Sequence, residues 1–265
     1  MKSKLVNLCL CISFIFFIGL LFIGQSHAKI DAKSIVGTWL FDDGNGKTAK
    51  DSSGNKNDGE LKGDLKWVNG KFGQAIEFPG VDNNFVEVPH NDSLTLKTFT
   101  FTAWVKLERI ANYQSIVIKT ADGATENYSG YLMDSSKVFW TRFTSGGAGK
   151  WAFQQFGKTA VADGSWHHVA GTYDMKSVKS YVDGVVEADA PFGGVPDPSP
   201  GPLNIGDCPN YPYFVKGIID DVGLFNVALT ADDLKTVIDK GLAIFLAVSP
   251  SGKLATKWGE IKDLR

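Results

Sequence analysis

The sequence predicts an all-β fold: a two-layer antiparallel β-sandwich of the jelly-roll type, with one short C-terminal helix. Three observations support this prediction. Apolar and polar residues alternate with a period of two over most of the chain beyond residue 29, turn residues separate the alternating runs, and helical patterns do not alternate with the strands. Without crossover helices the sheets are expected to be antiparallel, and roughly a dozen strands need two sheets packed face to face.

Runs of alternating aromatic and β-branched residues mark the strands most clearly. They cover residues 99–107, 115–119, 137–143, 151–156, 166–173 and 178–182. Residues 145–149 indicate a hairpin tip between two aromatic strands, and Asp183-Gly184 is typical of a two-residue type I′ turn.

One helix is predicted near the C-terminus. Thr230 and Asp233 resemble a capping box, apolar residues follow at helical spacing, and Gly241 ends the helix. The apolar stripe of this helix is expected to lie on the edge of the sandwich. We therefore expect one domain over residues 35–240, followed by an extension, residues 241–265, that packs on it.

Composition sets the class of protein. The 265 residues are 43% apolar and 21% charged, with a formal net charge of −2. These values are typical of soluble globular proteins and exclude disordered, collagenous and multi-span membrane chains. A slightly acidic chain gives no sign of nucleic acid as a partner.

The first 28 residues have the pattern of a signal peptide. Lys2 and Lys4 precede an apolar run over residues 5–23, and Ser26-His27-Ala28 supplies a small-x-small cleavage site. Cleavage after Ala28 predicts an exported protein, secreted, periplasmic or on the cell surface, with residues 29–34 leading into the domain. The alternative is an uncleaved anchor, because the apolar run is long for a signal peptide, and only then is the membrane a partner.

The mature chain is expected to hold a single cysteine, Cys208, because Cys9 and Cys11 lie in the signal segment. No intramolecular disulfide can then form. A domain of this size buries enough apolar surface without one, so a buried Cys208 is favoured over pairing between chains.

Several segments, taken in order, give the chain a family resemblance. Residues 37–43, 51–59, 73–80 and 99–105, followed by 164–174, 181–184, 203–206, 217–222 and 228–229, resemble the LamG-like jelly roll, a branch of the concanavalin A-like lectin/glucanase fold. Gly164-Ser-Trp-His-His-Val-Ala-Gly-Thr-Tyr-Asp174 is one such segment, and the resemblance spans about residues 35–230. It implies the sandwich fold, but such folds host glycosidases, lectins, adhesion modules and passive spacers.

Catalysis by paired carboxylates is not predicted. Retaining glucanases of this fold hold clustered acids on one strand, with two carboxylates about 5 Å apart. This chain has no alternating Glu-x-Asp-x-Glu arrangement, and the neighbours Asp220 and Asp221 point to opposite faces if they lie on a strand. It also lacks a Gly-x-Ser-x-Gly elbow. We therefore expect no enzyme, and a glycoside hydrolase is a distant alternative.

Five aspartates are candidate calcium ligands: Asp42, Asp43, Asp82, Asp220 and Asp221. They lie at predicted ends of elements, in oxygen-rich turns, and calcium accepts six to eight oxygen ligands. The first and last strands of a jelly roll run side by side, so the N-terminal and C-terminal pairs are expected to approach each other. One interpretation is a structural calcium ion, which relatives of the LamG-like family often use. The other is ordinary turn chemistry.

Aromatic residues with polar neighbours predict a carbohydrate-binding surface, because flat rings stack on sugar faces while polar groups bind hydroxyls. Over residues 138–143 alternation puts Phe139 and Phe143 on one face and Trp140 with Arg142 on the face toward water. The opposing interpretation is that half of the aromatic residues in alternating strands belong to the core. The candidate ligand-binding residues are Tyr113, Tyr128, Trp140, Arg142, Trp151, Tyr211 and Tyr213.

These observations together predict an exported, non-catalytic recognition or adhesion module. Its expected partner is a glycan or a glycosylated surface, and calcium is its expected structural cofactor. The alternative is a structural domain or one that binds a protein partner.

Overall fold

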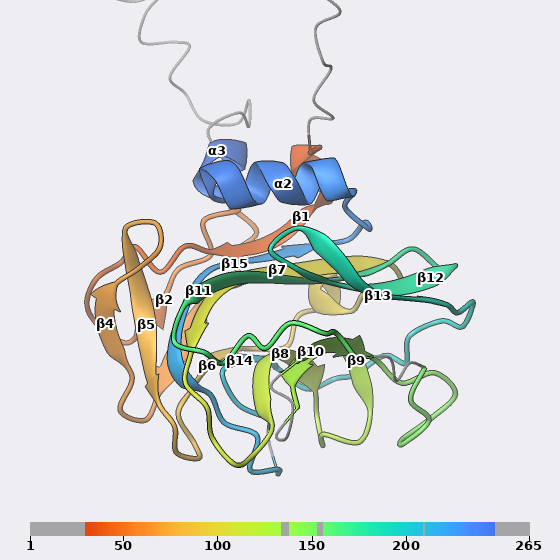
Figure 1. Ribbon diagram of the computed structural model, residues 1–265, viewed down its shortest axis with the longest axis horizontal. Coiled ribbons are helices and arrows are strands. Elements are labelled where there is room, and N and C mark those ends of the chain that lie inside the picture. Colours follow the sequence, from red (N-terminus) through yellow and green to blue (C-terminus); the bar gives the residue numbers. More distant parts are fainter. Residues whose placement is uncertain (1–29, 134–137, 153–155, 209, 247–265) are drawn as a thin grey trace, which may run out of the picture.

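The computed structural model describes residues 30–133, 138–152, 156–208 and 210–246. Their strands form two antiparallel sheets that stack face to face (Figure 1). Sheet A has the order β13-β12-β11-β7-β15-β5-β4, with β1 also paired to β15, and sheet B has the order β10-β9-β8-β14-β6-β3-β2.

The strands of sheet A are β1 (Ile35–Trp39), β4 (Lys66–Asn69), β5 (Gln74–Pro79), β7 (Phe99–Leu107), β11 (Trp166–Tyr173), β12 (Ser177–Val182), β13 (Val185–Pro191) and β15 (Lys216–Phe225). Those of sheet B are β2 (Thr48–Ala49), β3 (Gly59–Lys62), β6 (Phe85–Val88), β8 (Gln114–Thr120), β9 (Glu126–Leu132), β10 (Phe139–Arg142) and β14 (Leu203–Ile205). The helices are the 3-10 turns η1 (Ala32–Ser34) and η2 (Asp92–Leu94) and the α-helices α2 (Ala231–Lys240) and α3 (Ala243–Leu246).

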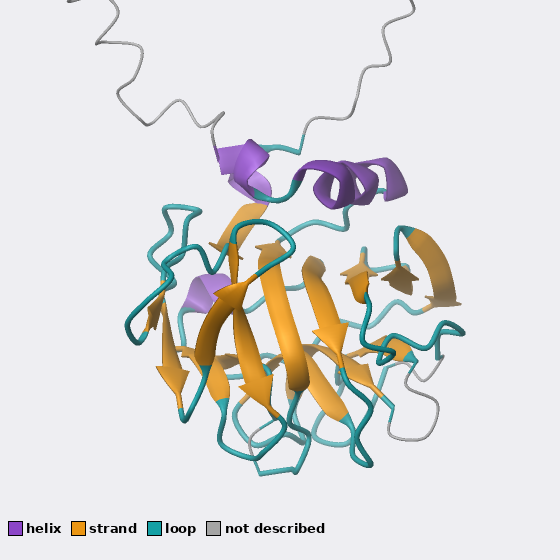
Figure 2. Cartoon of the chain, turned by 60° about the vertical axis from the view of Figure 1, so that its left-hand side comes forward, coloured by secondary structure: helices purple, strands orange, loops and turns teal. Residues whose placement is uncertain are grey.

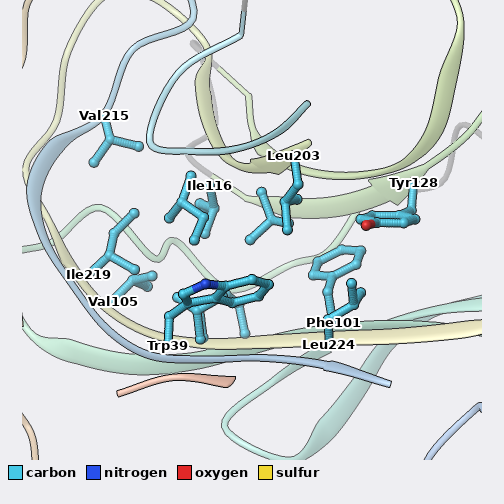
Figure 3. Close-up of a cluster of buried hydrophobic side chains, with 14 of the residues drawn as sticks. Trp39, Phe101, Val105, Ile116, Tyr128, Leu203, Val215, Ile219 and Leu224 are labelled. Carbon is cyan, nitrogen blue, oxygen red and sulfur yellow. The ribbon is translucent and has the colours of Figure 1, made fainter. Parts of the chain in front are cut away.

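The core lies between the two sheets (Figure 3). Because successive side chains of a strand point to opposite faces, one face of each strand fills this space. Phe101 and Val105 enter it from β7, and Ile116 enters it from β8. Trp39 of β1 is fully buried among them, and its indole N–H donates to the carbonyl of Asn57 at 2.8 Å, so the ring brings no unpaired donor into the core.

The α-helices lie against the outer face of sheet A, the face turned away from sheet B (Figures 1 and 2). Leu234 and Val237 of α2 pack there in one buried cluster with Ala170, Tyr181 and Phe225 from the strands. The amphipathic stripe predicted for this helix therefore covers an apolar sheet face and not the edge of the sandwich, because the outer face of sheet A carries apolar side chains that need a cover. No helix in the described part of the chain is long and apolar enough to cross a membrane.

The predicted sandwich and C-terminal helix are confirmed. Strands β7, β8, β10, β11 and β12 match predicted runs closely, and the predicted type I′ turn has positive φ at both Asp183 (49°) and Gly184 (78°). The run over 151–156 differs, because its described residues make only a bridge between Trp151 and Thr144, and residues 153–155 lie outside the described chain. Strand β9 was not predicted.

The two ends of the described chain lie on the same side of the molecule. Ile30 and Leu242 both belong to the cluster beneath α2, and Phe245 and Leu246 pack against it. The predicted signal segment, residues 1–28, lies outside the described residues, as does most of the predicted extension. The outer face of sheet B is on the opposite side of the sandwich (Figure 1).

Candidate functional site

The outer face of sheet B carries a cluster of aromatic and polar side chains. Strands β8, β9 and β10 turn Ile118, Tyr131 and Trp140 outward, where they pack with Cys208. Strand pairing sets this arrangement, because Trp140 lies opposite Tyr131, and Tyr131 lies opposite Ser115. We call the following rings, which line this surface, the aromatic face: Tyr113, Tyr131, Trp140, Trp151, Phe156, Tyr211 and Tyr213.

The rings contact one another across elements that are distant in sequence. Tyr211 and Tyr213 stack with centroids 5.3 Å apart and planes 25° apart, and Tyr213 also lies 5.1 Å from Tyr113. Phe156 lies 4.7 Å from Trp140. Tyr211 and Phe156 remain 38% and 40% exposed, so the cluster presents ring surface to solvent. These contacts gather rings from distant parts of the chain into one continuous surface.

A buried ion pair anchors the polar side of the aromatic face. The Glu126 carboxylate, 0% exposed, accepts hydrogen bonds from Nε and Nη2 of Arg142 at 2.9 and 2.5 Å and from the Tyr131 hydroxyl at 2.8 Å. It also accepts a short hydrogen bond from the Ser129 hydroxyl. Burial alone would lower the pKa of Arg142, but the charge and hydrogen bonds of Glu126 raise it above its ordinary value. The guanidinium therefore stays charged and fixed.

The same guanidinium also lies on the aromatic rings. Its central carbon is 3.9 Å from the ring centroid of Trp151, 4.5 Å from that of Tyr131 and 5.2 Å from that of Trp140. Cation–π contacts of this kind favour a desolvated arginine. Arg142 thus joins three rings and one carboxylate into a single rigid unit.

Several polar atoms beneath the rings have no hydrogen-bond partner among the described residues. They are Nε1 of Trp140, Oγ of Ser115, and both Nδ2 and Oδ1 of Asn204. Asn204 lies on β14 opposite Ile118, so it shares the outer face of sheet B. A buried polar group left without any partner costs about 1–3 kcal/mol, so these atoms call for a partner from outside the described residues, such as water or a ligand.

The structure brings together six of the seven predicted ligand-binding residues. Tyr113, Trp140, Arg142, Trp151, Tyr211 and Tyr213 all belong to the surface just described. Trp140 faces outward as predicted but is only 7% exposed, because Arg142 and Phe156 pack on its ring. The outward direction of Trp140 is as predicted, but its ring meets little water.

Tyr128 lies elsewhere. Its ring is 0% exposed in the core between the sheets, and its hydroxyl donates to the carbonyl of Leu94 at 3.1 Å (Figure 3). Tyr128 and Tyr131 are three residues apart on β9, an odd spacing that sends them to opposite faces of the strand. Sequence reasoning missed this because β9 was not predicted.

Sequence reasoning also missed Glu126, Ser115 and Asn204. An outward arginine between tryptophans is a signal for a nearby carboxylate, but glutamates scattered along the chain gave no basis for choosing one. Asn204 and Ser115 each stand in a short strand whose outward direction becomes clear only once its partner strands are known.

Three of the aspartates predicted as calcium ligands lie near β15. Asp220 accepts hydrogen bonds from the N–H groups of Lys71 and Phe72 at 2.7 and 2.9 Å, and Asp221 accepts one from Leu242 at 2.9 Å. Because β1 pairs with β15, Asp42 comes close to Asp221, as predicted, and its negative charge contributes to the raised pKa of Asp221. Burial raises the pKa of Asp220 to about 7 and that of Asp221 to about 6.

The other two predicted calcium ligands lie apart. Asp43 accepts a hydrogen bond from the N–H of Lys50, and Asp82 shares the N–H of Asn83 with Asp207. Within the described residues, no three His, Cys, Asp or Glu side chains are placed to hold one metal ion. The carboxylates instead accept backbone hydrogen bonds. The residues present therefore do not make up the predicted calcium site, and calcium binding stays a prediction.

A family model and several solved structures match this chain and have the same sandwich fold. A laminin G family model, described as the concanavalin A-like lectin/glucanases superfamily, matches residues 80–235. No curated protein matches the sequence. Domain 4 of AbnA, a GH43 extracellular arabinanase from Geobacillus stearothermophilus solved in complex with arabinotriose, is 20% identical with a TM-score of 0.62, and the match covers 77% of this chain and 98% of that domain.

Two toxin domains share the fold at lower identity. The binding domain of Paraclostridial Mosquitocidal Protein 1 is 17% identical with a TM-score of 0.62, over 78% of this chain and 52% of that one. The receptor binding domain of the botulinum neurotoxin C/D mosaic serotype is 14% identical with a TM-score of 0.63, over 79% and 52%. The chain thus spans about half the length of each toxin domain. By its family match and its fold, the chain belongs to the concanavalin A-like lectin/glucanase superfamily.

Proposed function

We propose that the protein is an exported, non-catalytic module that binds carbohydrate on the aromatic face of sheet B. The observation that carries this proposal is the gathering of seven aromatic rings on one face, three of them in contact with Arg142 of the buried Arg142–Glu126 pair, with Tyr211 and Phe156 exposed at the surface. Tyrosine and tryptophan rings offer flat apolar surface for the faces of sugars, while their polar atoms are available to hydroxyls. Export is supported by the signal-peptide pattern of residues 1–28.

Structures with the same fold support a binding role. The AbnA domain was solved in complex with arabinotriose, and the botulinum domain is a receptor binding domain. The match to the AbnA domain covers nearly all of that domain, so a module of this size and fold is sufficient to hold a short oligosaccharide. A short neutral oligosaccharide is therefore the first class of ligand to test.

The placement of the acids on this face supports a non-catalytic role. Glu60 and Glu87 lie opposite each other on β3 and β6, so they are the pair of acids to consider for the two carboxylates that a retaining glycosidase uses. Lys62 forms ion pairs with both, at 2.7 and 3.5 Å. Its ammonium group therefore occupies the space between the two carboxylates, where a substrate's glycosidic bond would have to lie. Glu126 is held by Arg142 and is fully buried.

The proposal is tested with a glycan array and two variants of exposed rings, Tyr211→Ala and Phe156→Ala. Each is expected to weaken carbohydrate binding by tenfold or more, since an exposed ring that stacks on a sugar loses its contact area, while the melting temperature stays unchanged. Val185→Ala, at a more exposed apolar position on sheet A, is the matched control and should leave binding unaltered. Array binding that survives both ring variants would remove the aromatic face from consideration, and a blank array would favour the protein-binding alternative.

The proposed non-catalytic role is tested separately. The purified protein, incubated with arabinan and β-glucan, is expected to release no reducing sugar. A turnover curve that Glu87→Gln abolishes would establish a hydrolase instead.

A further inference from the structure

The unpaired polar atoms of sheet B indicate what kind of ligand the aromatic face accepts. Asn204 is 1% exposed, and neither its amide nitrogen nor its amide oxygen has a partner within the described residues. The same holds for Oγ of Ser115 and Nε1 of Trp140. By contrast, the buried amide of Asn127 makes hydrogen bonds to both N–H and C=O of Leu96 and to the carbonyl of Asp197. Buried amides of this fold are thus ordinarily satisfied, and Asn204 is an exception.

The three unpaired side chains lie on strands β10, β8 and β14, and all three point to the outer face. Trp140 and Ser115 lie at the level of Tyr131, whereas Asn204 is displaced along the strands, because it lies opposite Ile118, which pairs with Ser129 of β9. Neighbouring strands lie about 4.8 Å apart, so the group spans about 14 Å across the sheet from β10 to β14. This length suits several linked sugar units rather than a single one.

These atoms carry no net charge and therefore favour an uncharged ligand. An amide, a hydroxyl and an indole N–H offer both donors and acceptors without net charge, which matches sugar hydroxyls. The nearest cation, Arg142, is neutralised by the buried Glu126, whose carboxylate takes up both Nε and Nη2. An anionic sugar would therefore meet no uncompensated positive charge at this group of residues.

We propose that Asn204, Ser115 and Trp140 form the hydroxyl-binding floor of the aromatic face, and that the ligand is an uncharged oligosaccharide lying across β14, β8, β9 and β10. This inference depends on the proposed carbohydrate-binding function. The ligand reaches the floor when partly exposed rings turn aside. Phe156 packs on Trp140, and the backbone of Tyr213 lies beside Ser115, whose N–H donates to its carbonyl at 2.8 Å.

The test is a titration calorimetry series with three probes: arabinotriose, cellotriose and the anionic sialyllactose. The wild-type protein is expected to bind at least one neutral probe and to bind sialyllactose more weakly. Asn204→Leu should weaken binding of the neutral probe about three- to tenfold, the loss of one or two neutral hydrogen bonds. It should also leave the melting temperature unchanged or higher, because an apolar side chain needs no partner.

Two further variants keep the outcome interpretable. Ser115→Ala, a smaller change, should weaken binding in the same direction. Asn127→Leu is the matched control: it should lower the melting temperature, because that amide has partners in the fold. If Tyr211→Ala weakens binding while Asn204→Leu and Ser115→Ala do not, the hydroxyl-binding floor is disproved and the proposed function stands. If no neutral probe binds, both fail, and tighter binding of sialyllactose contradicts the uncharged ligand.

Discussion

Glu126 shows how a single buried carboxylate organises the surface around it. It is fully buried, yet it accepts hydrogen bonds from Arg142, Tyr131 and Ser129, so its desolvation is offset by charge-assisted bonds. Arg142 in turn lies on the ring of Trp151. The rings of the candidate site therefore depend on a polar centre that the solvent does not reach.

Removing one partner of this pair should destabilise the fold strongly. Glu126→Leu leaves the Arg142 guanidinium, whose side chain is 13% exposed, without its carboxylate, and should lower the free energy of unfolding by about 3–5 kcal/mol. The double variant Glu126→Leu with Arg142→Met removes both charges and should cost less than the single one. Urea denaturation measures the free energy of unfolding of Glu126→Leu, of Arg142→Met and of the double variant. A double variant whose cost equals the sum of the two single costs would refute the coupling between these side chains.

Asp220 links stability to pH. Burial raises its pKa to about 7, so the native protein keeps its proton up to that pH, whereas the unfolded chain loses it near pH 4. Between these values the unfolded state binds fewer protons, and the free energy of unfolding falls as pH rises, by at most about 1.4 kcal/mol per pH unit for this group.

Asp220→Asn removes that titration and should flatten the slope of stability against pH between about pH 4 and pH 7. Asp221, whose pKa is raised to about 6, keeps part of the slope in the variant. Denaturation series on both proteins across this range measure the difference. Parallel curves would show that Asp220 is ionised in the native protein throughout.

The C-terminal helix is the element whose start is most sharply defined. Thr230 accepts a hydrogen bond from the N–H of Asp233 at 3.2 Å, and the Asp233 carboxylate accepts from the N–H of Thr230 at 3.0 Å. This reciprocal pair satisfies two of the donors that every helix leaves open at its N-terminus.

Thr230→Ala should therefore lower the free energy of unfolding by about 1 kcal/mol. The control is Thr236→Ala within the same helix, whose hydroxyl bonds only back to the carbonyl of Asp232 and whose replacement by alanine should be neutral or slightly stabilising. Thermal or urea unfolding distinguishes them, and equal effects would show that the cap contributes nothing specific.

The buried face of a strand could be predicted from the sequence where apolar and polar residues alternate regularly. On β10 the two faces were assigned correctly: Phe139 and Phe143 are in the core, and Trp140 and Arg142 point outward. The exposure of Trp140 could not be predicted, because the ring that covers it, Phe156, comes from a segment that forms no described strand. Tyr128 was misplaced because Asn127, Ser129 and Gly130 obscure the alternation of β9.

The whole molecule has two unlike outer surfaces. Sheet A is covered by α2 through an apolar cluster, and both ends of the described chain lie on that side. Sheet B presents the aromatic face on the opposite side. The aromatic face therefore lies on the side of the sandwich opposite to both ends of the described chain.

The sequence was sufficient for the architecture but not for the binding surface. Strand periodicity and turn residues predicted the sandwich, since burial acts on each strand separately. The floor formed by Asn204, Ser115 and Trp140 depends on which strands are neighbours in sheet B, and β14 joins β8 from far along the chain. Strand topology likewise decides which of the predicted calcium ligands meet: β1 beside β15 brings Asp42 near Asp221, and calcium binding itself stays a prediction.

The most direct test of the carbohydrate-binding claim is the NMR spectrum of the tryptophan indole N–H groups during titration with arabinotriose or another neutral trisaccharide. Trp140 on sheet B and Trp104 on sheet A both have an indole N–H with no partner among the described residues, so each is a sensitive probe of its own surface. If carbohydrate binds the aromatic face, the Trp140 signal shifts and the Trp104 signal stays in place. A shift of Trp104 with Trp140 unmoved would place the binding surface on the other sheet and contradict this prediction.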